Sequence, residues 1–126
     1  MRAMVYLAGH GPGPVPLSEI AREESIPAAF LERILGRLRV AGLLCTTRGV
    51  AGGYELARPS SAITANDVVT AVEGEQHVLD CLTDASSCDR AEFCSSQVVW
   101  RRLDEAIAGA LNEVTLDQLV REEIRR

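Results

Sequence analysis

The chain has 126 residues, of which 47% are hydrophobic, and its formal net charge at pH 7 is -5. This length and apolar content are enough for one domain with a single core and a small appendage. No stretch approaches the roughly 20 uninterrupted apolar residues of a membrane span, and the N-terminus is too short and too weakly charged for a secretory signal. These properties exclude a membrane-spanning chain and favour a cytoplasmic protein.

The charge is divided unequally along the chain. Residues 1–58 hold seven Arg against five acidic residues, which gives a net charge of +2. Residues 59–126 hold six Arg against thirteen acidic residues, which gives -7. The first half can therefore face a polyanion such as DNA, whereas the second half is repelled by it. Every basic residue is Arg, which suits bidentate contacts with phosphate and guanine, although a GC-rich genome explains this preference more simply.

The first half predicts three helices. Residues 2–9 and 17–23 have apolar side chains at helical spacing, and a stretch rich in Gly and Pro separates them. Residues 27–41 predict a longer helix, in which one stripe of large apolar side chains faces the core and Arg lies on the exposed face. A short helix, a tight turn and a longer helix with exposed Arg form the helix-turn-helix pattern of DNA-binding proteins.

The next segment predicts a β-hairpin. Residues 43–47 and 54–57 have the composition of strands, and a turn rich in glycine joins them. A hairpin directly after the third helix is the wing of a winged helix-turn-helix domain. Arg48 in the turn is placed to enter the narrow, electronegative minor groove of A·T-rich DNA, and a solvated loop charge is the alternative.

The second half predicts a helix at 63–73, for which Thr64 is the expected cap. An acidic segment without periodicity follows, and then an amphipathic helix at 97–111. The remaining chain has few residues to cover the apolar stripe of 97–111, so we expect this helix to pair with its twin in a homodimer. Packing against the winged-helix core is the alternative. A last helix begins at Thr115.

These elements predict a mainly α fold in three parts. Residues 1–74 form the winged helix-turn-helix DNA-binding domain with a small β-hairpin wing, and residues 75–96 form a cysteine-bearing loop. Residues 97–126 form the long dimerisation helix and a C-terminal helix. No Ser/His/Asp set, phosphate-binding loop or pocket-like pair of carboxylates is present, so an enzyme is not expected.

Three of the four cysteines, Cys81, Cys88 and Cys94, fall within the predicted loop. Thiolates are the preferred ligands of iron–sulfur clusters, and three thiolates in a short loop can surround one. The spacing matches neither ferredoxins nor the paired cysteines of zinc ribbons, so zinc binding and a thiol–disulfide switch remain alternatives. Cys45 is interpreted as a wing-strand residue rather than a ligand.

Motifs along the whole chain resemble the IscR/NsrR family, also called Rrf-two. They are Leu17–Ala21, Phe30–Leu35, Leu38–Leu43, Arg48–Gly49, Gly52–Leu56, Ala71–Gly74, the three loop cysteines, Trp100 and Val114–Leu119. The order of these motifs makes the resemblance specific. It implies a homodimeric transcriptional regulator, expected to be a repressor, that binds a pseudo-palindromic operator in double-stranded DNA. It implies no membrane partner and no small-molecule substrate.

The resemblance also assigns roles to residues. The positions that match DNA contacts of the third helix and the wing are Ala29, Glu32, Arg33, Arg48 and Gly49. Arg37, which lies on the same exposed helix face, is predicted to contact DNA as well. Glu32 would accept a hydrogen bond from a cytosine amino group, and Arg33 would reach a guanine or a phosphate. The three loop cysteines would hold a 2Fe–2S or 4Fe–4S cluster that senses iron–sulfur status, nitric oxide or redox stress.

Two departures from the family pattern affect these expectations. IscR-like members have a His ligand three residues after the last cysteine, where this chain has Gln97. Family members also start earlier, so either Met1 is an internal start or this chain lacks a segment that contacts DNA. The candidates for the fourth ligand are Gln97, His77, His10, Asp80, Asp84, Asp89 and Glu92. The alternative function is a cluster-free winged-helix regulator that acts as a thiol switch or through a partner protein.

Overall fold

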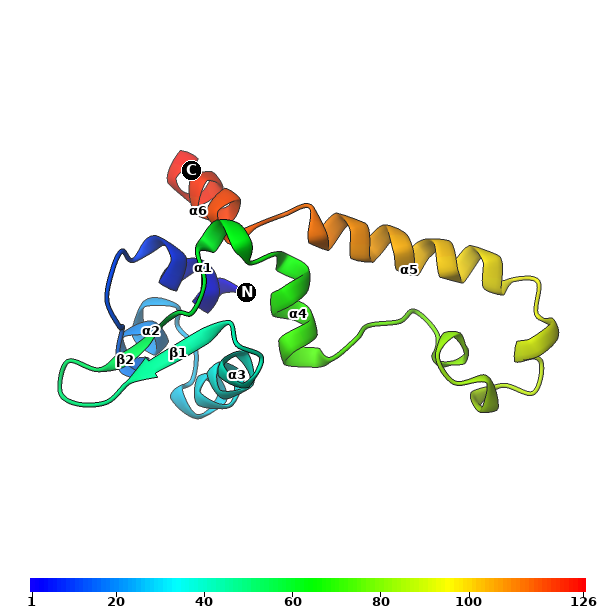
Figure 1. The fold of residues 1–126 in the computed structure, drawn as a ribbon, viewed down its shortest axis with the longest axis horizontal. Coiled ribbons are helices and arrows are strands. Elements are labelled where there is room, and N and C mark those ends of the chain that lie inside the picture. Colours follow the sequence, from blue (N-terminus) through cyan, green and yellow to red (C-terminus); the bar gives the residue numbers. More distant parts are fainter.

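Six α-helices and one antiparallel sheet make up the fold in the computed structural model, which describes residues 1–126. The elements are α1 (Arg2–Gly9), α2 (Leu17–Glu23), α3 (Ala28–Val40), β1 (Leu44–Thr47), β2 (Gly53–Leu56), α4 (Ala65–Glu73), α5 (Gln97–Asn112) and α6 (Leu116–Arg125). This order confirms the predicted mainly α winged-helix fold. In Figure 1 a body of α1–α4, the sheet and α6 lies at one end, and an arm of residues 75–112 extends away from it.

The core of the body contains 13 buried hydrophobic residues. On α3, Leu31, Leu35 and Leu38 share one face because they recur at helical spacing, and each is at most 1% exposed. Met4 of α1 and Leu116 of α6 are also fully buried in this core. Burying one such side chain contributes about 1.5–3 kcal/mol. The core therefore fixes α3 by one face and leaves its other face in solvent.

The wing is a two-stranded hairpin that is anchored at its base. Leu44 on β1 pairs with Leu56 on β2, and Thr47 pairs with Gly53. The backbone of Tyr54 exchanges two hydrogen bonds of 2.8 Å with Val15, in the segment between α1 and α2. A Cβ atom at Gly53 would lie 2.1 Å from the Val15 carbonyl oxygen, so this close approach requires glycine.

The chain returns to the body after the arm. Thr64 caps α4 in a capping box with Asp67, and Thr115 caps α6 in the same way. Directly before these helices, Thr64 and Thr115 form an antiparallel bridge. Beyond the bridge, α6 packs against α1. Both capping residues agree with the helix starts that the sequence predicts.

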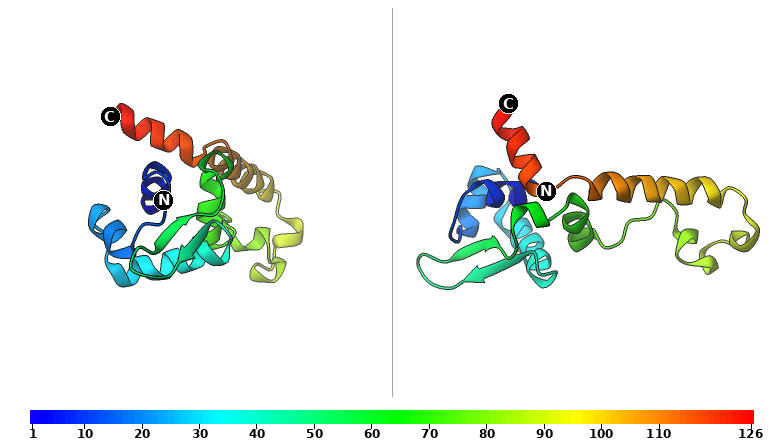
Figure 2. Two further views of the ribbon diagram at one scale, coloured as in Figure 1. Left: turned by 60° about the vertical axis from the view of Figure 1, so that its left-hand side comes forward. Right: turned by 45° about the horizontal axis from the view of Figure 1, so that its top comes forward.

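None of the residues of α5 is buried by the chain itself. Its apolar stripe includes Val99, Leu103 and Ile107, whose exposed fractions lie between 41% and 60%. Figure 2 shows α5 extending beyond the body in both views. The chain itself therefore leaves much of this stripe in solvent, although α5 also contacts α4 of the body. No helix of the structure combines the length and apolar content needed to cross a membrane.

Candidate DNA interface and cysteine loop

The residues predicted to contact DNA on α3 lie together on its exposed face, opposite the leucines of the core. Ala29, Glu32, Arg33 and Arg37 are all exposed. The Arg33 guanidinium carbon lies 5.8 Å from the centre of the Phe30 ring, within range of a cation–π contact. Arg37 donates a hydrogen bond of 2.8 Å from Nη1 to a backbone carbonyl of α4. The body thus presents both guanidinium groups on one surface.

The tip of the wing extends away from the rest of the body. Arg48 and Gly49 are exposed in the turn between β1 and β2, and Val50 beside them is fully exposed. Gly49 has a φ angle of 111°, a backbone conformation that favours glycine. Arg48 takes part in none of the ion pairs of the structure. Its charge is therefore available to an external anion.

The cysteine loop, residues 75–96, has local order that its sequence does not predict. It folds into three short 3₁₀ turns, Asp80–Leu82, Ala85–Ser87 and Ala91–Phe93. Asp84 stabilises the second turn because it accepts hydrogen bonds from the backbone and the hydroxyl of Ser86, which lower the pKa of its carboxyl group. These short-range contacts give the loop a shape without a core of its own.

All four cysteines are free thiols, and they differ in exposure. Cys81 and Cys94 are half-buried in the loop, and Cys88 is exposed. Cys45 is exposed on β1, where its thiol lies 3.8 Å from the carbonyl oxygen of Glu55. Three thiols in one accessible loop are chemically suited to hold an iron–sulfur cluster. Their present positions are not, since no three Cys, His, Asp or Glu side chains converge as a metal-binding group.

Most candidates for a fourth ligand already have hydrogen-bond or ionic partners. The Gln97 side chain accepts a hydrogen bond of 3.4 Å from Arg101, and His10 lies 3.4 Å from the carboxylate of Glu19 in the body. Asp84 is bound to Ser86 as described above. The candidates that are exposed and whose side chains form no hydrogen bond are Asp80, Asp89 and Glu92.

Cys94 is the loop thiol whose surroundings favour the thiolate. Its sulfur lies 2.9 Å from the hydroxyl oxygen of Ser96. Hydrogen bonds from the hydroxyl and then from the backbone of Ser96 lower the pKa of the Cys94 thiol. The thiolate is the form of cysteine that binds metals and reacts as a nucleophile. The lowered pKa therefore favours both metal coordination and oxidation at Cys94.

Replacing Ser96 with alanine should therefore slow the reaction of Cys94 with iodoacetamide near neutral pH. The pKa of the thiol rises when the hydroxyl is lost, so a smaller fraction is thiolate. The measurement is the alkylation rate of the Cys94 peptide across pH by mass spectrometry. Ser95→Ala is the matched control, and equal rates in the two variants would contradict the role of the Ser96 hydroxyl.

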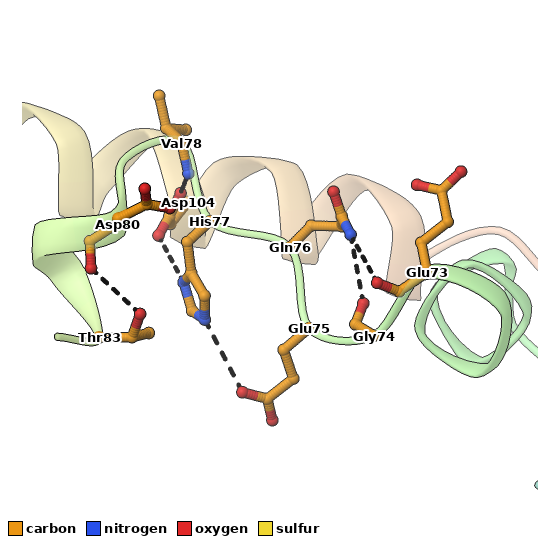
Figure 3. A network of polar contacts seen from close by, with 9 residues as sticks. All are labelled: Glu73, Gly74, Glu75, Gln76, His77, Val78, Asp80, Thr83 and Asp104. Carbon is orange, nitrogen blue, oxygen red and sulfur yellow. Dashed lines mark hydrogen bonds and ion pairs between the residues drawn. The ribbon is translucent and has the colours of Figure 1, made fainter.

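A polar clasp joins the start of the loop to the middle of α5 (Figure 3). Asp104 accepts a hydrogen bond of 2.8 Å from the backbone N–H of Val78 and lies 2.9 Å from Nδ1 of His77. This contact raises the pKa of His77 and lowers the pKa of Asp104. The other ring nitrogen of His77 lies 3.7 Å from the Glu75 carboxylate.

The sequence interpretation missed this clasp. The sequence indicated His77 as one candidate for the fourth ligand, and it indicated no role for Asp104. The two residues are separated by 27 positions, and only the folded path of the loop brings them together. We refer below to His77, Val78 and Asp104 as the clasp.

Known proteins of similar sequence and structure are regulators of transcription. The Rrf2 family model, described as an iron-dependent transcriptional regulator, matches residues 1–122. The HTH-type transcriptional regulator IscR of Erwinia tasmaniensis is 39% identical over 119 residues, which cover 94% of this chain and 72% of that protein. Relatives of this kind are DNA-binding regulators rather than enzymes.

Two solved structures share the fold over nearly the whole chain. T. potens IscR matches with a TM-score of 0.78 and 31% identity, over 97% of this chain and 80% of that one. CymR, the global cysteine regulator of B. subtilis, matches with a TM-score of 0.76 and 32% identity, over 94% and 88% of the two chains. Similar folds thus occur in proteins named for different regulatory roles.

Proposed function

Because this chain belongs to the Rrf2 family of transcriptional regulators, we propose that it represses transcription as a homodimer on double-stranded operator DNA. The state of the cysteine loop controls this binding. The observation that carries the proposal is the shared exposure of the α3 face and the wing on the basic part of an acidic chain. A helix held by its apolar face presents its polar face to the major groove, and a basic wing tip suits the minor groove.

The base-reading positions are Ala29, Glu32 and Arg33. Glu32 is suited to accept from a cytosine amino group, and Arg33 is suited to donate to guanine or phosphate. Arg37, Arg48 and Gly49 are expected to contact the DNA backbone or the minor groove. Such contacts place the protein in register on the duplex and leave sequence discrimination to α3.

The apolar stripe of α5 supports the homodimer, in which two α5 helices would pair. No residue of α5 is buried within its own chain, and the helix presents half-exposed apolar side chains at helical spacing. Two α3 helices about 34 Å apart would read successive turns of a palindromic operator. The dimer helix is therefore also the element that sets the spacing of the two recognition helices.

Cys81, Cys88 and Cys94 are the residues that would hold an iron–sulfur cluster. The iron dependence of the family description and the resemblance to IscR/NsrR both favour this cofactor. When bound, the cluster supplies an iron centre that reacts with oxygen and nitric oxide. The chain supplies three thiolates from one loop, and the loop must draw them closer together than they lie in this structure. A fourth ligand weaker than cysteine would leave one iron accessible.

A cluster-free thiol switch is the second candidate. The free thiols and the lowered pKa of Cys94 favour it, and so does the fold shared with a regulator named for cysteine. Oxidation would join two loop cysteines in a disulfide, with a peroxide as the oxidant and water as its product. Both candidates use the same loop, and they differ in whether iron is present.

The loop is suited to control DNA binding because it connects α4 of the body to the dimer helix. The clasp fastens the start of this loop to Asp104 on α5. A change in the shape of the loop therefore alters the angle of α5 relative to α4, and with it the spacing of the recognition helices. A difference of 1–3 kcal/mol between two dimer states is typical of such coupling.

Operator binding tests the proposed function. Duplexes selected by the protein from a random-sequence pool serve as the probe, in anaerobic gel shifts with and without iron and sulfide loading. We expect Arg33→Ala to weaken binding by roughly tenfold to a hundredfold and to relax specificity at one base pair. Arg121→Ala, on α6, is the matched control. Failure of the wild-type protein to select any duplex would refute DNA binding, and equal binding by loaded and unloaded protein would refute control by the loop.

Asp104→Ala should release the start of the cysteine loop from α5. The backbone N–H of Val78 loses its acceptor and exchanges with solvent faster, which hydrogen–deuterium exchange would detect. We also expect a smaller difference in operator affinity between loaded and unloaded protein. Glu105→Ala on the same helix is the control, and an unchanged difference in affinity would show that the clasp does not transmit the signal.

A further inference from the structure

We propose that a groove between α3 and α4 binds phosphates of the DNA backbone and so extends the DNA interface beyond the base-reading face. This inference rests on the proposed function. The groove has a volume of about 880 Å³ and is open to solvent. Four arginines line it, and we name it the arginine groove: Arg33, Arg37, Arg39 and Arg58. Arg39 and Arg58 have no role in the DNA interface predicted from the sequence.

The charge of the arginine groove is not neutralised by the protein. None of its four arginines takes part in any of the ion pairs of the structure. The acidic residue in the lining is Asp67, and its carboxylate is already engaged in the capping box of α4, where it accepts from the backbone of Thr64 at 2.9 Å. A chain of net charge -5 thus concentrates four unpaired cations in one place. Such a field favours an external anion.

The groove also contains groups suited to a phosphate oxygen. A guanidinium carries five N–H donors, and Arg37 uses one donor group to bind the Val72 carbonyl of α4. This bond fixes the side chain across the groove and leaves other donors free. Asn66 and Thr70 of α4 add neutral hydrogen-bonding groups to the lining. Charged and neutral donors together are typical of phosphate contacts on DNA.

Gly36 provides an independent indication that something approaches the helix closely. It lies inside α3, lines the groove, and a Cβ atom built there would meet nothing within 4 Å. Its backbone conformation is helical, and a glycine inside a helix destabilises the helix relative to alanine. Packing within the protein therefore does not explain it. Close approach of a nucleic-acid backbone to α3 does.

DNA is favoured over a small anion because the groove continues the base-reading surface. Arg33 and Arg37 belong both to the groove and to the exposed face that carries Glu32. A duplex bound by that face would carry its sugar-phosphate backbone along the helix toward Arg39. The groove is open rather than enclosed, which suits a continuous strand better than a small ligand that must be surrounded.

The salt dependence of operator binding tests the inference. Fluorescence anisotropy would compare wild-type protein with Arg39→Ala/Arg58→Ala on operator and on random duplex of the same length. Each phosphate contact contributes about 0.9 to the slope of log affinity against log salt concentration. The double variant loses two such contacts, so the magnitude of this slope should fall by about 2. Binding should weaken equally on both duplexes. The control is Arg121→Ala/Arg125→Ala on α6, for which no change is expected.

The outcomes separate the arginine groove from the proposed function itself. An unchanged slope in the double variant, with intact wild-type binding that responds to Arg33→Ala, overturns the groove and leaves the function standing. Thermal unfolding in the presence of inorganic phosphate is the second experiment. If millimolar phosphate raises the Tm of wild-type protein but not of the double variant, while the DNA slope is unchanged, the groove is a small-anion site and the inference is wrong.

Gly36→Ala gives a readout that a merely structural role would not produce. The variant should melt at a higher temperature than wild type, because alanine favours the helix, and yet bind operator severalfold more weakly. Gly109→Ala in α5 is the matched control, since a Cβ atom there also meets nothing within 4 Å. It should raise the Tm without loss of affinity. Unchanged affinity of Gly36→Ala would contradict close approach of the DNA backbone at this position.

Discussion

Replacing any one of Cys81, Cys88 and Cys94 with alanine should abolish the visible absorbance of protein purified without oxygen. The loop has three thiols and no fourth cysteine in reserve, so loss of one leaves too few thiolates to retain the cluster. Iron and sulfide content should fall together with the absorbance. Cys45→Ala is the matched control and should keep the colour, because this thiol lies on the wing strand.

An absence of visible absorbance in the wild-type protein would favour the thiol switch over the cluster. Colourless wild-type protein after anaerobic iron and sulfide loading would exclude the cluster. The thiol switch then predicts that a peroxide changes operator affinity and that a reductant restores it, with a disulfide found by mass spectrometry. If neither treatment changes DNA binding, the loop does not sense iron or redox state through its cysteines.

Introducing two carboxylates on the stripe of α5, with Leu103→Glu/Ile107→Glu, should convert the dimer to a monomer. Both side chains are close to half-exposed in the single chain, so the substitutions spare the core of the body. In the dimer they would place like charges in an apolar contact. Operator affinity should fall by roughly 10² or more, because two linked half-site contacts gain that much over one.

Sedimentation and anisotropy measurements on the same samples check this prediction. Arg102→Glu introduces the same charge on another side of α5, where an exposed arginine stands, and should leave the dimer intact. A far-UV circular dichroism spectrum like that of wild type confirms that the monomer is folded. A charged variant that remains dimeric would show that another surface forms the interface.

The parts of the structure that could be predicted from the sequence are those governed by neighbouring residues. The leucine stripe of α3, the caps at Thr64 and Thr115, and the glycine turn of the wing are local patterns with a local physical cause. Each specifies its element without knowledge of the rest of the fold. The exposure of the predicted α3 face also follows, since the opposite face must pack.

The parts that could not be predicted depend on residues far apart in the chain. His77 and Asp104 meet across 27 positions, and Arg58 joins the α3 arginines because the wing returns the chain to the end of that helix. The order within the cysteine loop was missed for a different reason. It consists of short polar contacts such as that of Asp84 with Ser86, which leave no apolar periodicity to recognise.

The bridge between Thr64 and Thr115, with α6 packed on α1, has a consequence for how the protein can change. The segment 65–114, which holds α4 and the arm, begins and ends at this bridge, so in topology it is an insertion into the rest of the body, which α6 closes by packing on α1. A conformational change in the cysteine loop can therefore move the arm relative to the rest of the body, while the winged helix stays folded. Substitutions in the arm can then change the signal that the protein senses, while the DNA contacts of α3 and the wing stay unchanged.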